Sequence, residues 1–185
     1  LVYDGTNFQM QSQVANAPTP ASATTTVEGI VKLDTYAIFQ DQKTSGTAGG
    51  TFTSGADRTR TINTSVLNEI VGASLSSNRI TLPAGDYELW SSSASAFCAG
   101  HRAKLRNITD STDEIVGAGT SSARASGSPE ATGTNATIEG KFTIAGTKAF
   151  EIQHRCAVSR SSDGLGKSSS FGTEIYTTVF IKKVG

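Results

Sequence analysis

Two cysteines and two histidines are the side chains of this sequence best suited to hold a metal ion. Cys98 lies close to His101 in the chain, and His154 lies close to Cys156. Two thiolates and two imidazoles can form a tetrahedral zinc site. Side chains alternate along a strand, so His154 and Cys156 share a face, whereas Cys98 and His101 do so only if Gly100 bends the strand. Buried free cysteines beside hydrogen-bonded histidines are the commoner arrangement of such residues. The four residues are therefore weak candidates for a metal site, and no cofactor is expected.

Other reactive groups do not form a catalytic set. Neither a nucleophile elbow nor a zinc-protease motif occurs in the sequence. Asp110, Asp113 and Glu114 flank a predicted turn and are interpreted as solvated charges. The Gly-Lys-Ser that ends residues 161–168 imitates a phosphate-binding loop, but Ser161 takes the place of its first glycine and no helix follows. We therefore expect that the protein is not an enzyme.

The charge and hydropathy of the chain exclude further classes of protein. Its 185 residues include 16 Lys+Arg and 16 Asp+Glu, so it lacks the basic surface typical of nucleic-acid binding. No apolar run approaches the ~20 residues of a membrane span, and no signal peptide is visible. We expect neither a nucleic-acid partner nor membrane insertion. The first residue is leucine, which indicates a fragment or a processed chain.

Short runs of alternating apolar and polar residues dominate the chain from Tyr36 onward. Clusters of Gly, Ser, Asn and Asp separate these runs, as in all-β proteins. No stretch has a convincing helical stripe. The pattern predicts an all-β, two-sheet antiparallel sandwich of jelly-roll type. Its predicted strands are Tyr36–Lys43, Ser65–Val71, Arg79–Leu82, Asp86–Ala96, His101–Asn107, Asp113–Gly119, Asn135–Ile144, Lys148–Ser159 and Thr173–Lys182.

The last two predicted strands differ in how their faces are filled. One face of residues 150–156 is apolar, and the other, which includes Arg155, is polar. In Ile175–Ile181, Tyr176 and Phe180 lie on the face opposite the aliphatic residues, so both faces are apolar. Only one face of a strand in a sandwich meets the core, and the other needs a different cover. We predict that Tyr176 and Phe180 lie in a subunit interface and that the protein is an oligomer, which would also compensate for its low content of large apolar residues.

The chain is predicted to have three parts. Residues 1–17 contain an Asp-Gly turn between short apolar runs and are interpreted as a hairpin at the end of an upstream module. Residues 18–35 begin with two prolines and a Thr/Ala/Ser run, which is typical of a linker or an extended shaft. Residues 36–185 are the predicted sandwich domain.

Several longer strings resemble known β-domains. Ile-Thr-Leu-Pro-Ala-Gly-Asp-Tyr-Glu-Leu-Trp at residues 80–90 resembles the strand–turn–strand motif of jelly rolls of the complement and tumour-necrosis-factor type. The strings at residues 41–55, 103–109 and 142–148 are similar to segments of C-terminal domains of bacteriophage tail fibres. Residues 25–33 resemble the short repeats of fibre shafts, and residues 2–8 resemble the last hairpin of an upstream fibre module.

The resemblance implies a homotrimeric jelly roll at the tip of a phage tail fibre or spike, carried on the virion after assembly in the host cytoplasm. Its expected partners are the upstream fibre modules and a bacterial surface receptor, for which we predict a glycan. Two alternatives stay open: a structural knob or needle tip that only locks the trimer, and a bacterial adhesin with the same fold. Charged residues of two long predicted loops either hydrogen-bond sugar hydroxyls or only keep the loops soluble; these are Arg124, Glu130, Arg160, Asp163 and Lys167.

Overall fold

A computed structural model describes residues 2–3, 8–9, 33–122 and 133–185. The chain divides into two units, Leu1–Lys32 and Leu33–Gly185. In the first unit, β1 (Val2–Tyr3) pairs with β2 (Phe8–Gln9) in antiparallel register. Most of the predicted linker or shaft at residues 18–35 lies outside the described residues. In the described part of the chain, no helix is long and apolar enough to cross a membrane.

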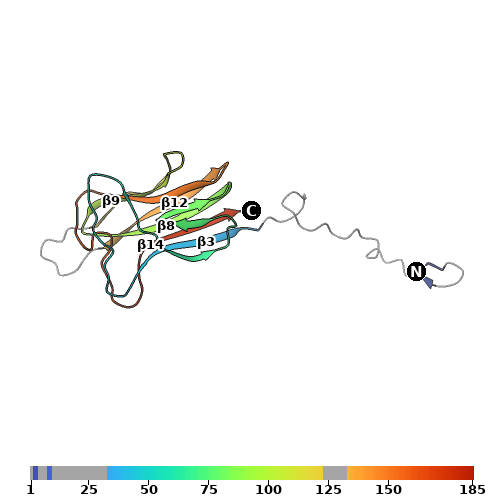
Figure 1. The fold of residues 1–185 in the computed structure, drawn as a ribbon, viewed down its shortest axis with the longest axis horizontal. Helices are drawn as coiled ribbons and strands as arrows, with labels where there is room; N and C mark the ends of the chain where they lie inside the picture. Colours follow the sequence, from blue (N-terminus) through green and yellow to red (C-terminus); the bar gives the residue numbers. More distant parts are fainter. Residues whose placement is uncertain (1, 4–7, 10–32, 123–132) are drawn as a thin grey trace. The chain divides into compact units, whose positions relative to one another are not determined.

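The second unit is built of antiparallel strands, which confirms the predicted all-β sandwich (Figure 1). All nine predicted strands are present, with ends shifted by no more than three residues. Three further strands, β4, β6 and β11, are too short to show an alternating pattern in the sequence. The strands are β3 Thr35–Lys43, β4 Arg58–Thr59, β5 Thr64–Asn68, β6 Ser74–Ser76, β7 Arg79–Leu82, β8 Gly85–Ala96, β9 Ala99–Asn107, β10 Thr112–Val116, β11 Thr120–Ser122, β12 Gly133–Ile144, β13 Lys148–Cys156 and β14 Glu174–Val184.

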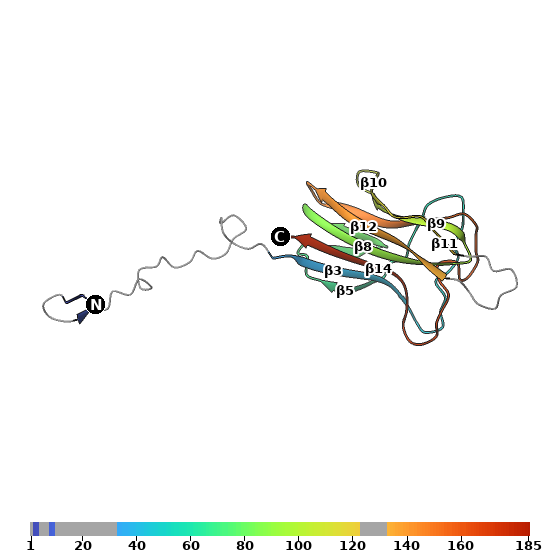
Figure 2. The same cartoon turned by 180° about the vertical axis from the view of Figure 1, so that it is seen from behind.

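Two sheets pack face to face in this unit. The five-stranded sheet has the order β12-β8-β14-β3-β5. The seven-stranded sheet has the order β10-β9-β13-β7-β6, with β11 paired to β9 and β4 paired to β13. Figure 2 shows β10 and β11 beside β9 from the opposite side of the molecule. The chain crosses between the sheets on each step from β7 to β9 and from β12 to β14, which is the connectivity of a jelly roll.

The core between the sheets changes character along its length. Tyr87 and Leu89 of β8 are buried in the apolar cluster, in the half of the sandwich nearer the C-terminus. Farther along the same inward face of β8, Ser91, Ser93 and Ser95 are buried instead. Their hydroxyl oxygens have no hydrogen-bond partner within the described residues. The sandwich therefore has an apolar half and a half lined by small polar side chains.

A β-bulge in β14 corrects the prediction for Tyr176. The pairing of β14 with β3 shifts register between Ile175 and Thr177, so Tyr176 is an extra residue and the faces of the strand exchange there. The Tyr176 ring points into the molecule, with 4% of its surface exposed, and its hydroxyl donates to the Thr47 carbonyl oxygen at 2.7 Å. Phe180 lies beyond the bulge, on the outer face. The prediction that Tyr176 shares an outward face with Phe180 is therefore wrong.

Candidate functional site

Two long loops close one end of the sandwich, which we call the loop end. Residues 44–57 and 157–173 lie there, at the end away from the C-terminus (Figure 1). The Gly49 amide donates to the Gly166 carbonyl oxygen at 2.8 Å, and Phe52 and Arg160 exchange two backbone hydrogen bonds of 2.8 Å. Because these bonds join the two loops, they form one structure at the loop end.

Glu174 fastens both loops to the start of β14. Its carboxylate accepts hydrogen bonds from the amides of Gly46 (3.1 Å), Ser169 (3.0 Å) and Ser170 (2.7 Å) and from the Ser169 hydroxyl (3.0 Å). The backbone bonds from Ser169 and Ser170 are the main reason that the pKa of Glu174 is lowered to about 2. The loops are therefore held by an anionic anchor at neutral pH.

We expect Glu174→Gln to loosen residues 165–173. Glutamine offers one acceptor oxygen in place of two, and its amide group cannot accept from the backbone donors. Limited proteolysis should cut these residues faster in the variant than in the wild type. Glu69→Gln, at an exposed acid outside the loops, is the control and should leave the cleavage rate unchanged. Equal rates for Glu174→Gln and wild type would contradict the anchoring role.

A small apolar cluster lies beneath the loops. Phe52, Cys98 and Cys156 are buried together, and Leu165 packs against them. The turn between β8 and β9 brings Cys98 inward, and Phe97 on its N-terminal side has a φ of 57°. The bend that the spacing of Cys98 and His101 required thus lies at Phe97 and Ala99, both with a φ of 57°, and not at Gly100, which lies within β9.

His101 and His154 form the polar centre next to this cluster. Nδ1 of His101 lies 3.0 Å from Nε2 of His154, so one ring donates to the other, and His101 Nε2 lies 2.8 Å from the Thr134 hydroxyl. Burial, with a smaller effect of the Arg60 guanidinium, lowers the pKa of His101 to about 4 and the pKa of His154 to about 2. Both rings are therefore neutral at pH 7.

The four candidate metal ligands lie in one region but are committed to other contacts. The two histidine rings bind each other, and the Cys98 thiol donates to the carbonyl oxygens of Ala96 (3.1 Å) and Gly164 (3.4 Å). Burial raises the pKa of Cys156 to about 11, which disfavours the thiolate that a metal ion requires. Across residues 33–122 and 133–185, no three His, Cys, Asp or Glu side chains are placed to hold a metal ion.

Arg60 is a fully buried cation between the sheets. Its Nε donates to the Thr177 hydroxyl at 2.8 Å, and its terminal nitrogens donate to the carbonyl oxygens of Ala94 (3.1 Å), Leu165 (3.1 Å) and Tyr176 (2.8 Å). Burial lowers the pKa of Arg60 to about 10, so the guanidinium is still charged at pH 7. One side chain thus ties β8, β14 and the second loop together.

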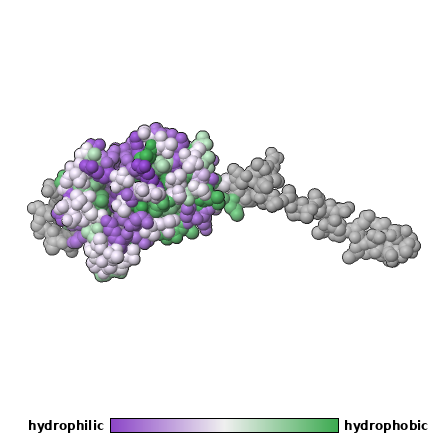
Figure 3. All heavy atoms as spheres, in the orientation of Figure 1, coloured by the Kyte–Doolittle hydropathy of each residue, from purple (hydrophilic) through white to green (hydrophobic). Residues whose placement is uncertain are grey.

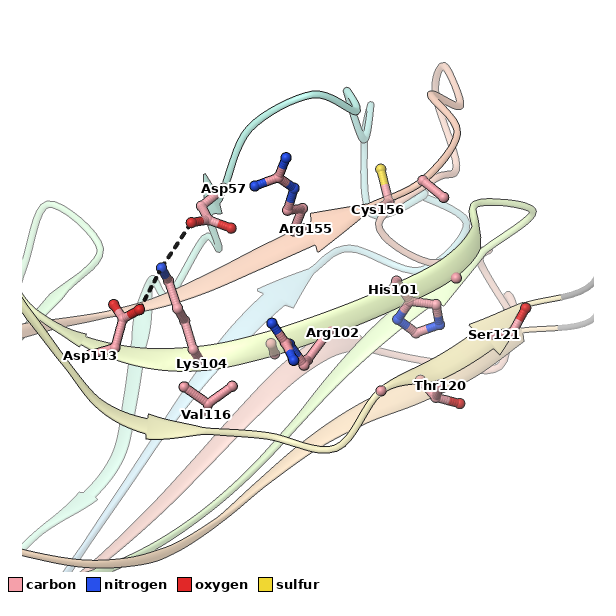
Figure 4. Close-up of a pocket in the computed structure, with 14 residues that line it drawn as sticks. Asp57, His101, Arg102, Lys104, Asp113, Val116, Thr120, Ser121, Arg155 and Cys156 are labelled. Carbon is pink, nitrogen blue, oxygen red and sulfur yellow. Dashed lines mark hydrogen bonds and ion pairs between the residues drawn. The ribbon is translucent and has the colours of Figure 1, made fainter.

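A groove with a volume of about 850 Å³ lies on the outer face of the seven-stranded sheet, close to the loop end. Figure 4 shows β9 and β13 along its floor and the segment from β10 to β11 along one wall. Arg102 and Lys104 project from β9, and Arg155 projects from β13. Thr120 and Ser121 of β11 also line the groove, and Ser121, opposite Gly100, is the one exposed on the face of β9 that carries Arg102. The groove therefore combines cationic groups with hydroxyl groups.

The cations of the groove differ in their partners. The Lys104 ammonium binds the carboxylates of Asp57 at 2.8 Å and Asp113 at 3.1 Å. Arg102 and Arg155 lie directly opposite each other in the antiparallel pair of β9 and β13, and both are exposed. In the part of the chain that the structure describes, neither has a carboxylate partner. Figure 4 shows both guanidinium groups extending toward the end of the groove where Lys104 lies.

The three described residues among those predicted to contact a receptor do not line this groove. The Arg160 guanidinium forms two bonds with the Asp163 carboxylate, of 2.6 and 3.2 Å, and lies 4.7 Å from the Phe97 ring centre. Arg160 and Asp163 therefore stabilise their own loop, while Lys167 is exposed nearby. A receptor role for these three residues stays a prediction. Arg124 and Glu130 lie outside the described residues.

Arg102 and Arg155 are not among the predicted site residues. The signal available in the sequence was that each lies at an outward position of a predicted strand. Their meeting depends on the pairing of β9 with β13, and the sequence does not give the register of two strands so far apart in the chain.

The comparisons with known proteins concern the architecture. No family model matches the chain, and no curated protein matches it. Among solved structures, a crystal structure of murine APRIL is similar in fold, with a TM-score of 0.47 and 12% sequence identity, over 80% of this chain and 99% of that chain. A likeness of this degree says nothing of what the present chain binds.

Proposed function

We propose that residues 33–185 are the receptor-binding tip of a trimeric bacteriophage tail fibre. The strings that resemble tail-fibre domains suggest the setting. The observation that carries the proposal is the difference between the two outer faces of the sandwich. One face is suited to contact other copies of the chain, and the other is suited to contact a polar ligand.

A row of apolar side chains crosses the outer face of the five-stranded sheet. Trp90, Phe180, Ile38 and Leu67 are neighbours in register on β8, β14, β3 and β5. The Tyr36 ring packs on Phe180 with 5.6 Å between ring centres. Figure 3 shows apolar surface gathered at the end of the domain near the C-terminus, next to β14 and β3. Exposed apolar patches of this kind are typical of faces covered by another protein, and we assign this one to the interface with two further copies.

The groove on the seven-stranded sheet faces away from this row. It lies near the loop end, whereas β3, the first strand of the domain, begins at the other end, where Thr35 pairs with Lys183 (Figure 1). In a trimer that buries the five-stranded sheet, the groove of each copy stays accessible near the loop end, opposite the start of β3. This placement supports a role in attachment.

Phe180→Asp and Trp90→Asp are each expected to dissociate the trimer. A carboxylate in the middle of an apolar interface loses its hydration without gaining a partner. Light scattering should give three times the chain mass of 19.2 kDa for the wild type and one chain mass for the variants. Val71→Asp is the matched control, because Val71 is 92% exposed and stands outside the row. A monomeric wild type, or two variants that stay trimeric, would contradict the assignment.

A second candidate function is a structural knob that locks the trimer and binds no receptor. The mutual pairing of Arg160 and Asp163 favours it, because these loop charges serve the loop itself. A cell-binding measurement on the whole chain distinguishes the two functions. A receptor-binding tip adheres to bacterial cells and reduces the adsorption of phage that carry the same fibre, whereas a knob does neither.

A further inference from the structure

We propose that Arg102 and Arg155 bind an anionic group, a carboxylate or a phosphate, of an acidic bacterial surface polysaccharide. The inference rests on the proposed receptor-binding function and names the chemical class of the receptor. The site is the groove between β10–β11 and the Asp57 loop, with the arginine pair on its floor.

The arginine pair lowers the stability of the domain when no ligand is bound. Like charges directly opposite each other on one face of an antiparallel pair repel, which lowers stability. Two other cations of the same sheet are neutralised by carboxylates: Lys104 binds Asp57 and Asp113, and Arg79 binds Glu151 at 2.9 Å. An anion between Arg102 and Arg155 removes their repulsion and accepts charge-assisted hydrogen bonds from planar groups that suit carboxylate and phosphate.

The surroundings of the pair suit a sugar. β11 pairs with the start of β9, and Ser121 lies opposite Gly100, so the exposed Ser121 hydroxyl is on the same face of the sheet as Arg102. Hydroxyl groups both donate to and accept from sugar hydroxyls. The groove volume of about 850 Å³ lies within the range of ~300–1,000 Å³ that is usual for ligand sites. The groove therefore has room for a few sugar units around one anionic group.

The carboxylates of the groove limit which polyanions fit. Asp57 and Asp113 lie at the Lys104 end and are both held by its ammonium. They repel a second anionic group placed there. The groove thus favours a polysaccharide with acidic groups spaced along it, each next to neutral sugars, over a continuous polyanion such as a nucleic acid.

The test uses an array of bacterial surface polysaccharides, each printed in native, carboxyl-reduced and dephosphorylated form. The whole trimeric chain is compared with Arg102→Gln/Arg155→Gln and with a control, Arg79→Gln/Lys141→Gln, that removes two positive charges elsewhere. We expect the wild type to bind acidic polysaccharides and to lose this binding when the acidic group is removed. Affinity of the arginine variant should fall on the order of tenfold or more, while the control keeps wild-type affinity. The form that loses binding tells whether the group is a carboxylate or a phosphate.

A thermal melt separates a binding defect from a folding defect. Since the substitution relieves repulsion, the Tm of Arg102→Gln/Arg155→Gln should equal or exceed that of the wild type. Undiminished binding by this variant would overturn the inference, as would wild-type binding to neutral and acidic forms alike, and in both cases the receptor-binding function would stand. A wild type that binds neither the array nor bacterial cells would overturn the proposed function itself.

Discussion

Arg60→Ala is expected to lower the free energy of unfolding by about 3–5 kcal/mol, the usual cost of breaking a buried charged network. The alanine removes the four hydrogen bonds that Arg60 makes to Thr177 and to three carbonyl oxygens. Burial raises the pKa of the buried Asp41, and the substitution also removes one of the two cations, Lys43 and Arg60, that oppose this rise. Urea unfolding at one fixed protein concentration measures the loss.

Arg58→Ala is the matched control for this experiment. Arg58 lies two residues away on β4, is exposed, and donates only to the carbonyl oxygens of Thr53 and Ser54. Its removal should change stability by no more than ~0.5 kcal/mol. If Arg60→Ala does not fold, Arg60→Lys keeps the charge without the planar fork and should lie between the two. A loss below ~1 kcal/mol for Arg60→Ala would contradict the role assigned to this network.

The protein should become less stable between pH 6.5 and pH 5, by about 2 kcal/mol from His154 alone. The pKa of His154 is about 2 in the folded chain against 6.5 for a free histidine. As the pH falls below 6.5, the unfolded chain binds a proton that the folded chain does not, so unfolding is favoured. His101, with a pKa of about 4 in the folded chain, acts in the same direction.

Carboxyl groups with lowered pKa values do not interfere in this window. Glu174 starts from an ordinary pKa of 4.5, so its contribution is lost only at lower pH. Asp41, whose pKa is raised by burial, acts in the opposite direction. A loss of stability in urea unfolding at pH 7, 6 and 5 therefore reports on the histidines. His154→Gln keeps a donor and an acceptor without a titrating ring, and its stability should depend less on pH. A wild type of constant stability from pH 7 to pH 5 would contradict the buried, neutral histidine pair.

The alternation of apolar and polar residues made the sandwich predictable. Strand β13 shows what this pattern predicts correctly and what it does not. Phe150, Ile152, His154 and Cys156 all lie inward, as their spacing predicts. Glu151 lies on the predicted polar face, yet it too is buried, because Thr59 and Arg79 cover and bind it. A periodic pattern assigns faces correctly but does not report what a neighbouring strand places over the outer face.

The position of Tyr176 depended on a contact that no pattern encodes. The ring packs on Gly166, where an added Cβ would clash with it. The bulge in β14 thus places the Tyr176 ring against Gly166 of the loop at residues 157–173. The alternation of inward and outward residues along β14 is interrupted at this bulge. The sequence shows two apolar faces at this strand but not the residue at which they exchange.

The groove with Arg102 and Arg155 was not predicted, because its residues come together only through contacts between distant segments. Charged residues in loops were chosen because loops carry binding residues in many folds. Arg160 and Asp163, however, are spaced so that they meet within one turn of the loop, a local signal of a structural pair. Arg102 and Arg155 meet only through strand pairing, so a site built on them depends on topology.

Ser91, Ser93 and Ser95 place the small polar half of the core beneath the loops, while Tyr87 and Leu89 belong to the apolar half at the other end. Hydrophobic stabilisation is roughly proportional to the apolar area buried, so most of it is supplied far from the loops. Changes confined to exposed residues of the loops therefore leave the apolar half of the core intact. The loops can thus vary in sequence while the fold is kept, which is a property that the proposed attachment function would use.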